Sequence, residues 1–147
     1  MEPLVGTASH WVHETVLSPD PTSAWRARDF VALQLVEHGL LHLVDDLRLA
    51  VSELATNAMR HARTPFTVTL QGGDASVLLT VKDGSTEAPA LADAHVLDLG
   101  GRGLSIVACL SREWGVIPSS DGTKSVWASF DQHAPRGGDG TSLEPVP

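Results

Sequence analysis

The sequence has little cysteine, no long apolar run and few basic residues. Its single cysteine, Cys109, can form neither an internal disulfide nor a site of several thiolates, which fits a reducing compartment. No run approaches the roughly 20 apolar residues of a membrane-spanning helix. The first residues also lack the basic segment and apolar block of a signal peptide. We therefore expect a cytoplasmic protein that does not bind a membrane.

The shortage of positive charge excludes a further class of protein. Ten Lys and Arg residues stand against eighteen Asp and Glu residues, which gives a formal net charge of −8. A protein with this balance repels a phosphate backbone instead of attracting it. We expect no direct binding of nucleic acid.

What the sequence does contain is enough apolar material for one compact domain. Its 147 residues are 42% hydrophobic, which suffices for a single core. We assign residues 1–9 to an N-terminal extension and residues 10–131 to the domain. Residues 132–147 are rich in Pro and Gly and have little to bury, so we expect a disordered tail there.

The order of the expected helices and strands predicts the fold class. Runs rich in β-branched and aromatic residues predict strands, at residues 11–17, 66–70, 76–81, 114–118 and 123–130. Apolar residues at helical spacing predict helices, from residue 22 or 23 to Gly39 and over 41–62. Residues 100–112 predict a glycine-rich loop that leads into a third helix. In the first of these helices the apolar positions are Trp25, Phe30, Leu33 and Val36. This order predicts an α+β fold, a two-layer α/β sandwich whose mixed, mostly antiparallel sheet carries helices on one face.

The second expected helix carries polar residues beside its apolar stripe. The stripe that should meet the sheet consists of Leu47, Val51, Leu54 and Ala58. Along one edge of it, at spacings of three and four, lie Glu53, Asn57, Arg60 and His61. Solvated boundary residues would give the same pattern, so the edge alone does not decide between a structural and a functional role.

Two further segments carry chemistry that suits a nucleotide. Asp83 follows an expected strand and could accept a hydrogen bond from an exocyclic amine. A helix that begins after glycines offers free backbone N–H groups and the positive end of its dipole to a phosphate. The glycines here are Gly100, Gly101 and Gly103, and Arg102 adds a positive charge.

In order and spacing, these segments resemble the nucleotide-binding boxes of the GHKL ATPases, the superfamily of histidine-kinase ATPase domains and gyrase-type ATPases. The matching segments are ELATNAMRHA (53–62), Asp83-Gly84-Ser85, Gly101-Arg102-Gly103-Leu104 and Gly122-Thr123. The chain is most similar to the short single-domain branch, the anti-sigma-factor serine/threonine kinases of actinobacterial type. The phrases SELATNAMRHA, GGRGLSIV and REWGV are typical of that branch, and the resemblance covers residues 10–130.

The resemblance implies a role for each site residue, with ATP and Mg²⁺ as cofactors. Asn57 would coordinate Mg²⁺ together with the ATP phosphates, because its amide oxygen is a suitable hard ligand. Glu53 would be the general base that takes a proton from the attacking hydroxyl. Asp83 would bind the adenine amino group, and the hydroxyl of Thr123 would assist it.

The glycine box and its neighbours would hold the phosphates. The resemblance implies backbone contacts from Gly101, Gly103 and Leu104, with charge added nearby by Arg60, His61 and Arg102. The adenine box departs from the family, which usually has glycine two residues after its Asp. Ser85 stands at that position and changes how closely the backbone can approach the base.

Three functions remain open from the sequence. The first is an anti-sigma factor that binds a sigma factor and phosphorylates a serine of an anti-anti-sigma (STAS-type) partner. The second is a non-catalytic module that binds its partner stoichiometrically, with a degenerate or purely regulatory nucleotide pocket. The third, an interaction domain without nucleotide, requires the order of the boxes to be a coincidence. The resemblance also implies a homodimer.

Overall fold

The computed structural model describes residues 10–61, 64–83 and 101–133. The expected N-terminal extension, Ser85 and residues 134–147 of the expected tail lie outside this part of the chain. All the helices and strands expected from the sequence are present. They are β1 (Trp11–Leu17), α2 (Thr22–Glu37), α3 (Val44–His61), β2 (Phe66–Gly72), β3 (Ser76–Asp83), α5 (Gly101–Leu110), β4 (Glu113–Pro118) and β5 (Lys124–Asp131).

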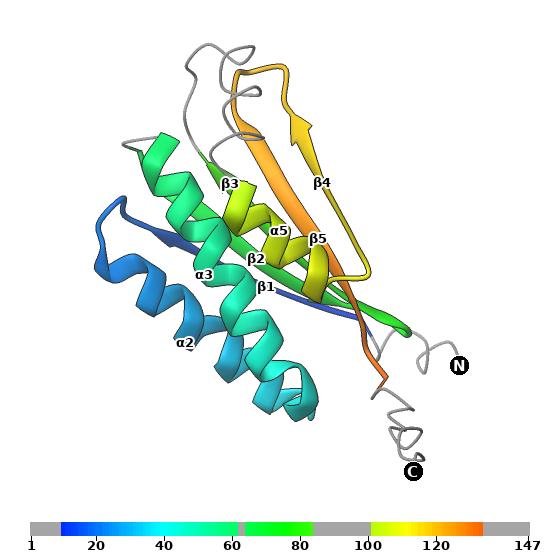
Figure 1. Ribbon diagram of the computed structural model, residues 1–147. Coiled ribbons are helices and arrows are strands. Elements are labelled where there is room, and N and C mark those ends of the chain that lie inside the picture. Colours follow the sequence, from blue (N-terminus) through cyan, green and yellow to red (C-terminus); the bar gives the residue numbers. More distant parts are fainter. Residues whose placement is uncertain (1–9, 62–63, 84–100, 134–147) are drawn as a thin grey trace, which may run out of the picture.

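The expected α+β two-layer architecture is confirmed. The sheet has five strands in the order β1-β2-β3-β5-β4, and α2, α3 and α5 lie on one of its faces (Figure 1). Every pairing between the described strands is antiparallel, so the parallel component of the expected mixed sheet is absent from this part of the chain. Several boundaries differ by one or two residues from those expected, and β3 extends to include Asp83. A short 3₁₀ turn (Leu41–Leu43) also precedes α3 where the sequence predicted continuous helix.

The position of β5 in the sheet determines which strand ends lie together at the site. β2 and β3 form a hairpin. β5 lies between β3 and its sequence neighbour β4, and it pairs with both. Because β3 and β5 run in opposite directions, the last residue of β3 lies beside the first residue of β5. Asp83 and Lys124 are therefore cross-strand neighbours.

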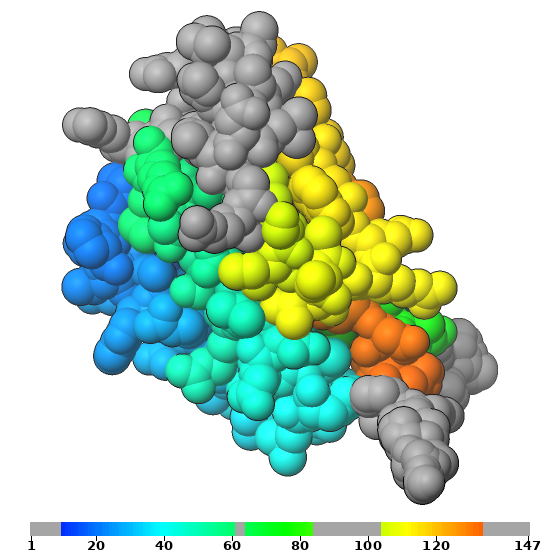
Figure 2. All heavy atoms as spheres, in the orientation of Figure 1, coloured from blue at the N-terminus to red at the C-terminus, as the bar shows by residue number. Residues whose placement is uncertain are grey.

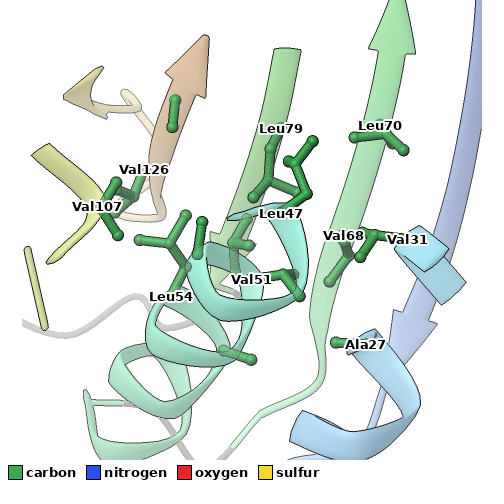
Figure 3. Packing of buried hydrophobic residues seen from close by; sticks show 14 of the residues in the cluster. Ala27, Val31, Leu47, Val51, Leu54, Val68, Leu70, Leu79, Val107 and Val126 are labelled. Carbon is green, nitrogen blue, oxygen red and sulfur yellow. The ribbon is translucent and has the colours of Figure 1, made fainter. Parts of the chain in front are cut away.

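The core lies between the sheet and α3, the central helix. The predicted stripe of α3 is buried as expected, at Leu47, Val51, Leu54 and Ala58. Figure 3 shows Leu47 beside Leu79 of β3, Val51 between β3 and β2, and Leu54 on the side toward Val107 of α5. In the space-filling view α2 and α3 lie side by side, and α5 lies on the other side of α3 (Figure 2). The three helices thus form one layer over the sheet.

α2 is apolar on two opposite sides. Ala27, Val31 and Leu35 are fully buried against the rest of the protein. Three of the four apolar positions noted in the sequence face outward instead, since Trp25, Leu33 and Val36 are 56%, 53% and 51% exposed. No helix of the described residues is long and apolar enough to cross a membrane.

The orientation of α3 can be tested by truncating one side chain on each side of it. Leu47 is 0% exposed, so Leu47→Ala should leave a cavity and lower the free energy of unfolding by about 2–5 kcal/mol. Leu49→Ala is the matched control, because Leu49 is 44% exposed and its loss should change stability by about 0.5 kcal/mol or less. Urea unfolding of both variants measures the difference, and equal losses would contradict the observed orientation.

Candidate functional site

A pocket lies between α3 and the adjoining ends of β3 and β5. Its lining residues come from these three elements and are Leu54, Asn57, Ala58, Val81, Asp83, Lys124 and Val126. Its enclosed space is about 10 Å³, which is roughly the room that one water molecule needs. The described walls therefore show the chemistry of the pocket and do not by themselves set the size of a ligand.

The polar end of the pocket is an ion pair. Lys124 Nζ donates to Asp83 Oδ2 at 3.0 Å. Both residues are buried, at 8% and 3% exposure. They belong to the inward-facing rows of β5 and β3 that also contain Val126 and Val81. A hydrogen-bond donor and an acceptor thus stand next to each other between apolar walls.

The helical side of the pocket contributes an amide and a carboxylate. Asn57 lines the pocket, and Glu53 lies one turn earlier on the same edge of α3, as the sequence predicted. Both residues are half-buried, and neither makes a side-chain hydrogen bond within the described part of the chain. Their oxygens can therefore receive water or a ligand. The structure brings Asn57 and Asp83, which are far apart in sequence, to one pocket.

The expected phosphate-binding segment begins a helix beside α3. Gly101, Arg102 and Gly103 form the first turn of α5, and the structure describes only their backbone. Leu104 is 4% exposed, and its side chain belongs to the core. Figure 1 shows that α5 begins toward the end of the sheet where β3 ends. The backbone N–H groups of its first turn are thus on the side of the molecule that holds the pocket.

The remaining expected residues are placed differently. Arg60 is exposed in the last turn of α3, and His61 ends that helix. Ser85 lies outside the described residues. Thr123 is buried, but it is not among the residues that line the pocket. The structure therefore brings Asn57 and Asp83 together, with Glu53 one turn away, and does not bring Thr123 to them.

The turn before β5 explains the position of Thr123. Its hydroxyl donates to Asp121 Oδ1 at 2.6 Å, and its backbone N–H donates to the same oxygen at 3.1 Å. These two hydrogen bonds hold the pKa of Asp121 below its ordinary value, and the bond from the hydroxyl has the larger effect. In this structure the hydroxyl that was expected to assist at the adenine donates its hydrogen bond within the turn.

Lys124 is the charged residue of the pocket that the sequence did not predict, in addition to its apolar walls. Inward-facing residues of β5 alternate with outward-facing ones, and the inward row is Lys124, Val126, Ala128 and Phe130. In the sequence, every second residue of this strand is apolar, and Lys124 occupies the next position of that alternation. This pattern could have identified it as an inward-facing lysine.

Comparison with known families agrees with this geometry. The family model described as the histidine kinase-like ATPase domain matches residues 17–130, which is more than half of the chain. This chain belongs to the histidine kinase-like ATPase family. The GHKL resemblance is thereby confirmed, and membership supports an ATP-binding function. No curated protein matches the sequence.

The pocket of this histidine kinase-like ATPase domain fits the cofactor that the family implies. Leu54, Ala58, Val81 and Val126 offer apolar contact to a planar base, and Asp83 offers a carboxylate acceptor at one end. Asn57 supplies an amide oxygen, a kind of ligand that suits Mg²⁺, and the carboxylate of Glu53 lies one helical turn away from it. The residues present are thus chemically suited to a magnesium nucleotide.

The burial of the ion pair predicts a strong effect on stability when only one partner is removed. Asp83→Ala leaves the Lys124 ammonium buried without its partner, so the free energy of unfolding should fall by about 3–5 kcal/mol. Replacing both residues, by Asp83→Leu with Lys124→Met, should restore most of that loss.

Urea unfolding gives each value. Lys82→Met is the matched control, since Lys82 is exposed on the same strand and its change should cost about 0.5 kcal/mol or less. A loss for Asp83→Ala no larger than that of the control would contradict a buried pair.

Proposed function

We propose that this protein is an ATP-binding regulator, an anti-sigma factor with magnesium- and ATP-dependent serine/threonine kinase activity. The observation that carries the proposal is the shared pocket of Asn57 and Asp83. The family resemblance assigns these residues to opposite ends of one nucleotide, the metal end and the adenine end. The match to the histidine kinase-like ATPase domain supports the nucleotide, and the resemblance to the anti-sigma branch supports the kinase.

Binding in this pocket would use different groups for the base and the phosphates. Asp83 accepts a hydrogen bond from the amino group of adenine, while the apolar walls contact the ring. Asn57 holds Mg²⁺, and the first turn of α5 directs backbone N–H groups toward the phosphates. When bound, Mg²⁺ neutralises charge on the phosphates and so lowers the barrier to transfer.

Glu53 is the side chain of this protein that takes part in the transfer step, as the general base. Its carboxylate takes the proton from a serine hydroxyl of the partner as the serine oxygen bonds to the γ-phosphorus. The bond from that phosphorus to the bridging oxygen breaks, and ADP leaves with those electrons. Because Glu53 is half-buried on a helix packed into the core, its position relative to Asn57 is well defined.

The partners follow from the same resemblance. A sigma factor is the protein that the regulator sequesters, and a STAS-type anti-anti-sigma protein carries the serine that it phosphorylates. A homodimer and a cytoplasmic location belong to the same proposal. Large apolar side chains on the outward side of α2, at Trp25, Leu33 and Val36, support contact with another protein.

Replacing the proposed base separates catalysis from binding. Glu53→Gln removes the proton acceptor and keeps the size of the side chain, so phosphotransfer to a purified STAS-type substrate should fall by about 10²–10⁴-fold. ATP affinity, measured by calorimetric titration, should stay within about twofold.

Asp45→Asn is the control on the same helix, since Asp45 is exposed in the first turn of α3 and should retain transfer. If Glu53→Gln transfers phosphate as fast as the control, Glu53 is not the base. If the variant loses transfer and still regulates its partner in full, the non-catalytic binding module is the better description.

Replacing the proposed metal ligand tests the other end of the nucleotide. Asn57→Ala should remove the magnesium dependence of ATP binding, as measured by calorimetric titration with and without Mg²⁺. Thr56→Ala is the matched control, because the Thr56 hydroxyl donates to the backbone carbonyl of Ser52 within the helix and should not touch the metal. An unchanged magnesium dependence in Asn57→Ala would exclude the metal role. No saturation of the unmodified protein at millimolar ATP would exclude the nucleotide.

A further inference from the structure

Lys124 is a buried cation that the proposed chemistry does not use. It lines the pocket together with Asn57 and Asp83, to which the proposed function assigns roles in binding ATP. Its ammonium group donates to Asp83 Oδ2 at 3.0 Å, and only 9% of its side chain is exposed. Burying a lysine this deeply is costly unless its charge is compensated.

Stability alone does not explain the pair. Moving two charges out of water costs several kcal/mol per ion, and their attraction often no more than offsets that cost. A well-packed apolar pair at residues 83 and 124 would hold β3 and β5 together as well or better. The surrounding pocket walls are apolar, at Leu54, Val81 and Val126. A charged pair placed at the polar end of such a pocket is typical of groups that recognise a ligand.

The arrangement of donor and acceptor matches one edge of adenine. The ammonium group has three N–H donors and needs only one for Asp83, whereas a carboxylate accepts from several directions. Adenine carries its amino donor on C6 directly beside the acceptor N1. Thr123 does not compete for this edge, because its hydroxyl is bonded to Asp121.

We propose that Lys124 determines base specificity by donating a hydrogen bond to N1 of adenine while Asp83 accepts one from the amino group. This inference rests on the proposed ATP binding and assigns a residue to it that the sequence did not suggest. Hypoxanthine has the opposite pattern, with an acceptor at C6 and a donor at N1. Because the strand register fixes Asp83 and Lys124, inosine triphosphate meets the wrong partner at both positions.

The test compares two ligands in two proteins. The ligands are ATP and 1-deaza-ATP, in which a C–H group replaces N1, and calorimetric titration measures their dissociation constants. The unmodified protein should bind 1-deaza-ATP about 10–100-fold more weakly, as expected for a lost hydrogen bond to a charged group. Lys124→Met should bind ATP more weakly and should bind the two ligands within about twofold of each other.

In each protein the dissociation constant for 1-deaza-ATP is divided by that for ATP. Comparing this quotient between Lys124→Met and the unmodified protein isolates the contact between Lys124 and N1 from other effects of the substitution. Lys82→Met is the matched control, since Lys82 is the exposed neighbour of Asp83 and should keep the full discrimination. If Lys124→Met does not fold, the unmodified protein still gives a result with 7-deaza-ATP, which lacks an acceptor on another edge of the base. If Lys124 donates to N1, the unmodified protein should lose affinity for 1-deaza-ATP and keep its affinity for 7-deaza-ATP, which retains N1.

The outcomes separate this inference from the function on which it rests. Equal affinity of the unmodified protein for ATP and 1-deaza-ATP overturns the role of Lys124 and leaves ATP binding intact. Discrimination that persists in Lys124→Met also overturns it. Absence of ATP binding by the unmodified protein overturns the proposed function itself.

Discussion

The antiparallel pairing of β3 with β5 is the constraint on which the pocket depends. It places β5 between β3 and β4 and sets the end of one strand against the start of the other. Both ends then face α3, which supplies Asn57 from the opposite wall. Without this pairing the carboxylate, the ammonium and the amide would be three unrelated surface groups. The site is thus a product of sheet topology as much as of its motifs.

The parts of this site that the sequence predicted are those set by local geometry. Glu53 and Asn57 are four residues apart on a helix, so their common edge follows from the helical repeat alone. The buried stripe of Leu47, Val51 and Leu54 follows from the same repeat and is observed. The strands were also predictable, since each is a short run of β-branched or apolar residues between turn residues.

The parts that could not be predicted depend on contacts between distant segments. Lys124 and Asp83 are 41 residues apart, and only the register of two strands makes them neighbours. Thr123 directly precedes Lys124, the first residue of the inward-facing row of β5, and its hydroxyl is directed to Asp121. On α2 the repeat itself was ambiguous. Both sides of the helix are apolar, and only packing reveals that Val31 is buried and Leu33 is exposed.

The loop from residue 119 to residue 123 now acquires a meaning beyond connecting two strands. Its ends are joined by a backbone bond from Ser119 N–H to the carbonyl of Thr123 at 2.8 Å, and Gly122 adopts a φ of 92°, which favours glycine. Side chains alternate between the two faces of a strand, so the parity of this loop decides which of them meets Asp83. If the turn kept its present form and β4 its register, one residue added or removed before Lys124 would shift β5 by one position and turn Lys124 to the outer face. A hairpin loop that contributes no side chain to the pocket thus takes part in presenting the pocket's ammonium group.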